Sequence, residues 1–513
     1  MGEGGVLNSG VSAVPPLELQ QQGKRKSNTY SMVSAILAST VSILLGYDTG
    51  VMSGAAIFIK EDLKISDPQI EILVGIINIC SLLGSAFAGR ISDWIGRRYT
   101  IVFASVIFFA GAIFMGLAPN FGWLLVGRIV AGIGVGFALM IAPVYTAEIA
   151  PATARGFLTS FPEVFINSGV LLGYVSNIAF AGLPANLSWR LMLGVGGIPS
   201  LLLAFGILVM PESPRWLVLQ GQLGKARQVL IKTCDSKEEA ELRLAEIKTA
   251  VGISKNIVDD VVTVPKHNNG EGVWKELLRP TPSVRRVLII SVSLFFFAQA
   301  SGIDALVLYS PRIFQQAGIK KKSDMLGATV AVGICKTMFV LVATFLVDRI
   351  GRRPLLLTSV GGVIVCLLGL ASALMVVDHS EKPPMWAIVL CVAMTLLFVA
   401  SFSIGFGPIP WVYGSEILPV RLRAQGVSIG VAANRLMSGL LGMTFLSLYK
   451  ALTIEGTFFM FAGITAGAWM FFYASLPETR GKTLEEMEGL FSTSMFKWKK
   501  SMKKDNDVAE NQN

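Results

Sequence analysis

The six-residue stretch DWIGRR at 93–98 returns almost unchanged as DRIGRR at 348–353. A second stretch, PESPR at 211–215, is matched in the same order by PETR at 477–480. Each pair lies at a corresponding place in one half of the chain. The ordered matches indicate an internal duplication.

Long apolar runs surround these motifs. Of the 513 residues, 53% are hydrophobic and 15% are charged, whereas soluble domains have about 25% charged residues. Apolar runs of about 20 residues, each able to cross a hydrocarbon core of about 30 Å, recur about twelve times. Examples are Ile101 to Leu117, Leu191 to Met210, Leu355 to Val377 and Phe458 to Leu476. Continuous apolar runs favour helices over barrel strands. The sequence therefore predicts an all-α membrane protein with twelve transmembrane helices in two six-helix halves, an arrangement that places a substrate site between the halves.

The polar stretches between the apolar runs set the expected domain boundaries. We expect an N-terminal tail over 1–29, a six-helix domain over 30–211, a linker with short amphipathic helices over 212–283, a second six-helix domain over 284–476, and a C-terminal tail over 477–513. The chain does not begin with a basic region and a short apolar core, so the first span is expected to stay in the mature protein. Most of the 44 Lys and Arg residues lie in the tails, the linker and the even-numbered connections. This distribution predicts that both termini and the linker are cytoplasmic, and it accounts for the net charge of +10 without a nucleic-acid partner.

Cysteine and histidine are used too sparsely for metal or redox chemistry. The five cysteines form no CxxC pair, and the two histidines lie in expected loops. This pattern argues against a metal site, a disulfide framework and histidine-based catalysis. We therefore expect no cofactor and no enzymatic activity.

Several motifs give the chain a family resemblance. Five of them resemble the signatures of the sugar porter branch of the major facilitator superfamily: GRISDWIGRR (89–98), PESPRWL (211–217), VDRIGRR (347–353), GPIPW (407–411) and PETRGK (477–482). Four others resemble plant polyol/monosaccharide transporters: SFPEV (160–164), QASGID (299–304), GICKT (333–337) and ANRLMSG (433–439). The resemblance covers about residues 30–482. It implies the major facilitator fold and proton-coupled symport of polyols (sorbitol, mannitol, inositol) or monosaccharides across the plasma membrane by alternating access. The expected partners are the substrate, a proton and membrane lipid, and we expect a monomer.

Asp48 lies inside the first expected span, within LGYDTGVMSG. An ionised carboxylate there costs roughly 3 kcal/mol on insertion scales and is a functional hypothesis by default. Arg128 in the fourth span is its natural partner. We expect protonation of Asp48 to break this pair and free the helices to rearrange, and the family pattern places its proton-binding aspartate and partner arginine at these positions. The alternative is a fixed structural salt bridge.

A polyhydroxylated ligand needs amides, carboxylates and an aromatic surface around it, because each hydroxyl both donates and accepts hydrogen bonds. The candidate substrate-binding residues are Glu163, Gln299, Asp304, Tyr309, Lys336, Trp411, Asn434 and Arg435. For each polar member the alternative is an interhelical hydrogen bond, and for Trp411 it is packing. The prolines before Trp411 are expected to break the tenth span so that it bends as a gate. Lys336 in the eighth span must face a cavity or a counter-charge, and we expect Asp304 rather than Glu163 to be its partner.

The duplicated loops also predict a conformational latch. Glu148 precedes Arg155 by seven residues, and Glu416 precedes Arg423 by seven, which is a third match between the halves. The arginines of each loop can reach these glutamates, and such networks would hold one conformation and break in the other. The expected latch residues are Asp93, Arg97, Arg98, Glu148, Arg155, Asp348, Arg352, Arg353, Glu416 and Arg423. The alternative is that basic residues only keep these loops inside.

Two other interpretations concern the class of protein. Gly132, Gly134 and Gly136 do not fit a nucleotide-binding loop, and we interpret them as sites of close helix approach. Apart from a symporter, the sequence leaves open a proton-independent sugar uniporter and a nutrient sensor built on a transporter fold.

Overall fold

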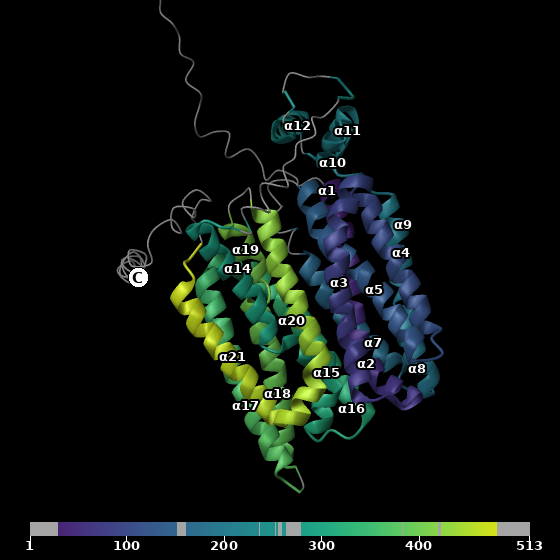
Figure 1. The fold of residues 1–513 in the computed structure, drawn as a ribbon, viewed down its shortest axis with the longest axis vertical. Helices are drawn as coiled ribbons and strands as arrows, with labels where there is room; N and C mark the ends of the chain where they lie inside the picture. The colour runs from purple at the N-terminus through teal and green to yellow at the C-terminus, as the bar shows by residue number, and fades with distance from the viewer. Residues whose placement is uncertain are drawn as a thin grey trace, which may run out of the picture.

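The computed structural model describes residues 29–150, 158, 161–234, 236–251, 253–254, 259–262, 277, 279–381, 383–418 and 422–479. The regular structure in these ranges is helical, without a strand. Two bundles of long helices stand side by side, and three short helices lie beyond one end of the first bundle (Figure 1). We call the end that carries the short helices the linker end, and the opposite end the distal end.

The helices follow the duplication seen in the sequence. The first bundle contains α1 (Thr29–Ser39), a 3-10 turn (Thr40–Ser42), α2 (Ile43–Leu63), α3 (Asp67–Ile95), α4 (Arg97–Gly116), α5 (Phe121–Ile149), α7 (Phe161–Phe180), α8 (Ala185–Val195) and α9 (Gly197–Leu208). The short helices are α10 (Pro214–Leu219), α11 (Leu223–Thr233) and α12 (Lys237–Val251). The second bundle contains α14 (Pro282–Ala300), α15 (Ile303–Gln316), α16 (Lys322–Ile350), α17 (Arg352–Asp378), α18 (Met385–Ser401), a π-helical turn (Phe402–Phe406), α19 (Ile409–Ile417), α20 (Arg423–Leu452) and α21 (Ile454–Ser475).

Twelve helical stretches of the described chain are long and apolar enough to cross a membrane, six in each bundle. The prediction of an all-α membrane protein with two six-helix halves is therefore confirmed. The short helices α10 to α12 pack around a small apolar core of their own that includes Leu223, Leu230 and Leu244. The domain boundaries proposed from the sequence stay a prediction.

Two spans of the second bundle are interrupted near their middle. The seventh span breaks at Gly302, which adopts a positive φ of 86° between α14 and α15. The tenth span passes through the π-helical turn, in which Gly407 N donates to Phe402 O at 2.9 Å, before α19 begins at Ile409. The helix break expected before Trp411 is therefore present.

Glycines bring the helices of the first bundle into close contact. A Cβ atom on Gly136 of α5 would lie 2.2 Å from Ser81 O of α3, and one on Gly134 would lie 2.8 Å from Phe108 N of α4. A Cβ on Gly132 would lie 2.8 Å from the Cβ of Cys80. No side chain fits at these distances, so the interpretation of the three glycines as sites of close approach is confirmed.

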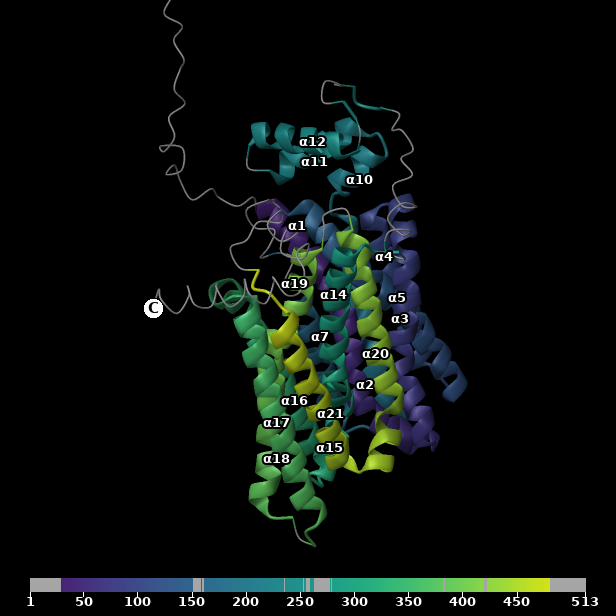
Figure 2. The same cartoon turned by 60° about the vertical axis from the view of Figure 1, so that its left-hand side comes forward.

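The two bundles meet along three helix pairs: α3 with α20, α7 with α16, and α2 with α15 (Figures 1 and 2). In the first pair, a Cβ on Gly75 would lie 2.4 Å from Cγ of Met443. This contact belongs to the distal half of both helices, because α3 begins and α20 ends at the distal end.

Replacing Gly302 with alanine should lower the thermal stability of the protein. A non-glycine residue with positive φ costs about 1–2 kcal/mol, and a Cβ here would lie 2.6 Å from the Phe461 ring. We expect a lower unfolding midpoint in a thermal scan of the detergent-solubilised protein. Gly467→Ala is the matched control, because a Cβ at that helical position meets nothing within 4 Å. Equal midpoints for the two variants would contradict this account of the break.

Candidate functional site

Asp48 of α2 and Arg128 of α5 form an ion pair inside the first bundle. The Arg128 Nη1 atom donates to both carboxylate oxygens, at 2.6 and 2.7 Å. The two residues are 1% and 0% exposed, so water does not screen the pair. Arg128 Nε also donates to Leu73 O of α3 at 2.9 Å, and one guanidinium thereby joins three helices. The pairing expected from the sequence is present.

Several candidate substrate residues of the second bundle form one polar cluster between α14 and α20. Asn434 Oδ1 accepts from Gln299 Nε2 at 3.3 Å and from Arg435 Nη2 at 2.7 Å. Asn434 Nδ2 donates to Phe295 O at 3.3 Å, and the Phe295 ring meets the Trp411 ring edge-to-face at a centroid distance of 5.1 Å. Four of the eight candidates thus come together around Phe295.

Gln299 has an amide oxygen that is not used within the described structure. The side chain is 7% exposed, and its Oε1 atom has no hydrogen-bond donor among the described residues. A buried acceptor without a donor is costly. A hydroxyl group of a ligand could satisfy Oε1, and this chemistry suits a polyol.

Asp304 and Tyr309 lie on α15 and both bind α20. The Ser438 hydroxyl donates to Asp304 Oδ2. The Tyr309 hydroxyl donates to Gly442 O at 2.6 Å, and the Tyr309 ring stacks on Phe445 with centroids 5.2 Å apart. Tyr309 is 1% exposed, so in this conformation it has the interhelical role that the sequence left open as an alternative. Ser438 was missed among the candidates, although it lies within the ANRLMSG motif at 433–439.

Glu163 and Lys336 lie where α7 meets α16. Asn167 Nδ2 donates to Glu163 Oε1 at 3.2 Å, and Thr337 Oγ1 donates to Asn167 O at 3.2 Å. A Cβ on Gly333 would lie 2.8 Å from the Tyr174 ring. Since Gly333 and Thr337 both contact α7, Lys336 on the same face of α16 points toward the boundary between the bundles.

The expected ion pair of Lys336 with Asp304 is absent from this conformation. Among the described ion pairs none involves Lys336, and Glu163 is not its partner either. The physical reason is that Asp304 is engaged on α20 through Ser438, whereas the neighbour of Lys336, Thr337, binds α7. Proximity in sequence between the seventh and eighth spans was a poor guide to the direction of the side chains.

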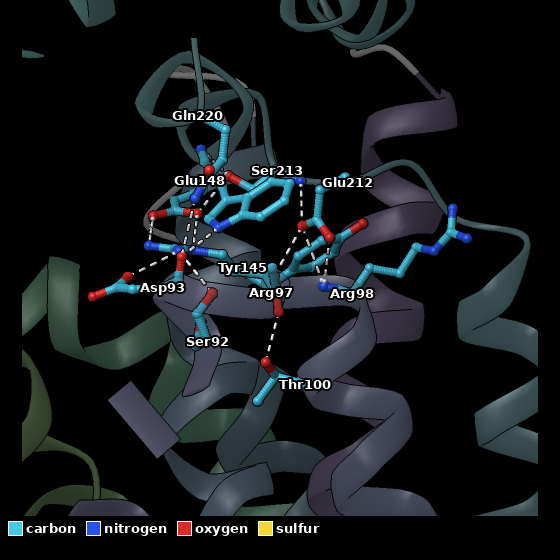
Figure 3. A network of polar contacts seen from close by, with 12 residues as sticks. Ser92, Asp93, Arg97, Arg98, Thr100, Tyr145, Glu148, Glu212, Ser213 and Gln220 are labelled. Carbon is cyan, nitrogen blue, oxygen red and sulfur yellow. Dashed lines mark hydrogen bonds and ion pairs between the residues drawn. The ribbon is translucent and has the colours of Figure 1, made fainter. Parts of the chain in front are cut away.

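At the linker end of the first bundle, the loop between α3 and α4 carries a compact charge network (Figure 3). The Arg97 guanidinium binds Glu148 Oε2 at 3.1 Å and Asp93 Oδ1 at 3.0 Å. Glu212 accepts from the backbone N–H groups of Arg97 and Arg98, at 2.9 and 3.2 Å. Glu212 therefore caps the N-terminus of α4, where backbone donors have no partner inside the helix.

The second bundle repeats this network. Arg352 Nη2 binds Glu416 Oε1 at 2.9 Å. Glu478 accepts from the backbone N–H groups of Arg352 and Arg353, at 3.1 and 2.9 Å. The Thr479 hydroxyl donates to Glu416 Oε2 at 2.7 Å, as the Ser213 hydroxyl does to Glu148 Oε2 at 2.5 Å in the first bundle.

The remaining latch candidates divide into two groups. Arg98 Nη1 donates to Met210 O at 3.0 Å and Arg353 Nη2 to Tyr473 O at 3.1 Å, so these two guanidinium groups bind backbone carbonyls rather than Glu148 or Glu416. Arg155 and the side chains of Asp348 and Arg423 lie outside the described residues.

Besides Ser213 and Thr479, two pairs of residues in these networks were not among the sequence candidates. They are Glu212 and Glu478, and the tyrosines whose hydroxyls donate to Pro211 O and Pro477 O at 2.6 and 2.8 Å, Tyr145 and Tyr413. The signal was available, because YTAE at 145–148 and YGSE at 413–416 keep the same spacing. Burial raises the pKa of the Glu212 carboxyl, and the backbone N–H groups of Ser213, Arg98 and Arg97 oppose that rise.

Comparisons with known proteins agree with this architecture. A family model described as "Sugar (and other) transporter" matches residues 34–491. The chain is 62% identical over 481 residues to "Polyol transporter 5" of Arabidopsis thaliana, which covers 93% of this chain and 89% of that protein. The solved structure of the proton:xylose symporter XylE bound to 6-bromo-6-deoxy-D-glucose matches with a TM-score of 0.74 and 29% identity, over 91% of this chain and 100% of that chain. An inward-open structure of XylE from E. coli matches with a TM-score of 0.73 and 27% identity, over 90% of this chain and 100% of that chain. The expected major facilitator fold is confirmed.

Removing the cap at Glu212 should destabilise the first bundle. Glu212→Ala leaves the backbone donors of Arg97 and Arg98 without their acceptor, and loss of a cap costs about 1–2 kcal/mol. We expect a lower midpoint of thermal unfolding, and a similar decrease for Glu478→Ala because its contacts are the same. Glu246→Ala, an exposed position on α12, is the control and should keep the parental midpoint. A normal midpoint for both cap variants would show that these carboxylates do not stabilise the helix ends.

Proposed function

The chain belongs to the sugar (and other) transporter family, and we propose that this transporter carries polyols such as sorbitol, mannitol and inositol, and monosaccharides, together with protons. Membership of this family makes the protein a transporter rather than an enzyme, as expected. The polyol preference is supported by the similarity to "Polyol transporter 5" and by the amide cluster of Gln299 and Asn434.

The observation that carries the proposed proton coupling is the buried Asp48–Arg128 pair. While Asp48 is ionised, the pair is stable, because separating a buried carboxylate from its partner costs about 3–5 kcal/mol. Protonation removes the charge of Asp48 and leaves the guanidinium with Leu73 O as an acceptor. The bond between α2 and α5 then weakens, and α2 can change its position relative to α5. Binding of a proton thus permits a movement that the ionised pair opposes.

The proposed coupling can supply enough free energy for accumulation. One proton that moves down a potential of about 150 mV contributes about 3.5 kcal/mol, or roughly 300-fold in substrate concentration. A uniporter with the same binding groups would only equilibrate its substrate. Accumulation therefore separates the two functions.

We assign the substrate to the boundary between the bundles, where α7 meets α16, α2 meets α15 and α3 meets α20, and the amide cluster between α14 and α20 would line it from the second bundle. Lys336 and Arg435 are polar groups within this region and would bind hydroxyl oxygens directly. In the proposed cycle, alternating access opens this boundary first at one end and then at the other.

We further propose that the protein is a monomer in the plasma membrane, with the linker end and both termini in the cytoplasm. The excess of Lys and Arg in the linker and the tails supports this orientation. The distal end is then extracellular. The apolar outer surfaces of the two bundles contact lipid.

Asp48→Asn should abolish proton-driven accumulation. The amide cannot ionise, so the pair with Arg128 no longer responds to protons, whereas exchange of substrate can continue. We would measure uptake of labelled sorbitol by transporter-deficient cells that express the variant. The external pH is set to 5.5 or 7.5, so that the proton gradient across the membrane differs between the two conditions. Asp378→Asn, an exposed carboxylate, is the control and should behave like the parent. Concentration of sorbitol by Asp48→Asn against its gradient would refute the proton role of Asp48.

Trp411→Ala should weaken substrate binding. The indole lies edge-to-face with Phe295 beside the amide cluster, and its loss removes an aromatic surface for the carbon skeleton of the ligand. Loss of one such contact raises KM about tenfold if it contributes about 1.4 kcal/mol. The control is Trp386→Ala, since this tryptophan is 59% exposed on the surface of the bundle. If KM for sorbitol stays at the parental value at equal surface expression, Trp411 serves packing alone.

A further inference from the structure

We propose that Asp67 and Glu71 of α3, with Arg312 of α15 and Ser447 and Lys450 of α20, form the gate that holds the distal end closed. We call these five residues the distal gate. None of them belongs to the sequence motifs that identified the family. The gate joins the first bundle to the second, because α3 belongs to one and α15 and α20 belong to the other.

Asp67 is the charged centre of the distal gate. Its carboxylate pairs with Lys60 of its own bundle, with Lys450 of the other bundle, and with Arg312 Nη1 at 3.2 Å. The Asp67 side chain is 14% exposed and that of Arg312 is 15% exposed, whereas Lys450 is 52% exposed. The Arg312 contact is therefore the more shielded of the two bonds between the bundles.

Glu71 lies one helical turn further into the bundle and is 2% exposed. Its Oε1 accepts from the Ser447 backbone N at 2.7 Å, and its Oε2 accepts from the Ser447 hydroxyl at 2.6 Å. Both oxygens of one buried carboxylate thus bind a single residue across the boundary. A buried charge that loses its donors is strongly unfavourable unless water replaces them.

The distal gate differs in kind from the charge networks at the linker end. In those networks, Arg97 binds Glu148 and Arg352 binds Glu416, so each pair stays within one bundle. At the distal end, Asp67 and Glu71 bind residues of the opposite bundle. A further ion pair between the bundles, Glu61 of α2 with Lys322 of α16, also lies at the distal end.

Opening of the distal end would cost Asp67 some of its partners and Glu71 all of its described ones. Asp67 keeps Lys60, which belongs to the same bundle. Arg312 and Lys450 move away with the second bundle, and water then solvates both cations. Glu71 loses both donors at once and must be hydrated where it was buried. Glu71 should therefore contribute more than Asp67 to the closed state.

The test measures how often the distal end opens. Met443 is half-buried and packs on Gly75 beside the gate, so opening of the gate should increase the access of an aqueous reagent to a cysteine at 443. Met443→Cys protein in right-side-out vesicles is treated with a membrane-impermeant thiol reagent, and the same chain without this substitution gives the background from its five native cysteines. We expect Glu71→Gln to speed labelling about tenfold, equivalent to about 1.4 kcal/mol, and Asp67→Asn to speed it by a smaller factor.

Asp62→Asn is the matched control. Asp62 is another carboxylate near the distal end, but it binds Arg190 and the Trp189 indole within the first bundle. Its loss should leave the labelling rate unchanged. Ser447→Ala removes only the hydroxyl donor to Glu71, and it provides a milder gate variant in case Glu71→Gln fails to fold. Its labelling rate should lie between that of the parent and that of Glu71→Gln.

Parental labelling rates for Asp67→Asn and Ser447→Ala would overturn the proposal, and so would equal acceleration by Asp62→Asn. The labelling requires neither substrate nor a proton gradient. The proposal of the distal gate can therefore be refuted while proton-coupled transport is confirmed. Equally, the gate can be confirmed while proton coupling is refuted.

Discussion

A carboxylate and a guanidinium can lie deep inside a membrane bundle only if they lie together. Asp48 and Arg128 satisfy this constraint, and the additional bond from Arg128 to Leu73 O ties α3 into the same contact. Neither charge can be left alone without a large cost. The arrangement of α2, α3 and α5 therefore depends on the ionisation of one side chain, and this dependence is what makes the proposed coupling to protons physically reasonable.

Much of the fold could be predicted because it is determined by short stretches of sequence. Runs of apolar residues long enough to cross a bilayer predicted the twelve spans, and the paired motifs at 93–98 and 348–353 predicted two related halves. Asp48 and Arg128 could also be paired in advance, because buried charges of opposite sign have few other places to go. The prolines before Trp411 indicated the break of the tenth span for a similarly local reason, the missing amide donor.

The contacts that could not be predicted depend on which way each helix faces. Lys336 was assigned to Asp304 because their spans are neighbours in sequence, but Gly333 and Thr337 turn that face of α16 toward α7. Ser438 lies in the ANRLMSG motif, yet nothing in that motif indicates that its hydroxyl binds Asp304, and Ser447, which binds Glu71, belongs to no motif. A pairwise assignment of this kind needs the rotation of both helices.

The duplication has a mechanical consequence. In both bundles, a glutamate after the last span binds the backbone at the start of another helix, through Glu212 at α4 and Glu478 at α17. Tyr145 and Tyr413 bind the same connections through Pro211 O and Pro477 O. These bonds stay inside one bundle, so they make each bundle stiff without fixing its angle to the other. Carboxylate bonds that do fix the angle, such as Glu71 with Ser447, lie near the distal end, and neutral bonds such as Thr337 with Asn167 O join α16 to α7 further along. A structure with stiff halves and a small set of bonds between them changes shape by moving whole halves, because that movement breaks the fewest contacts.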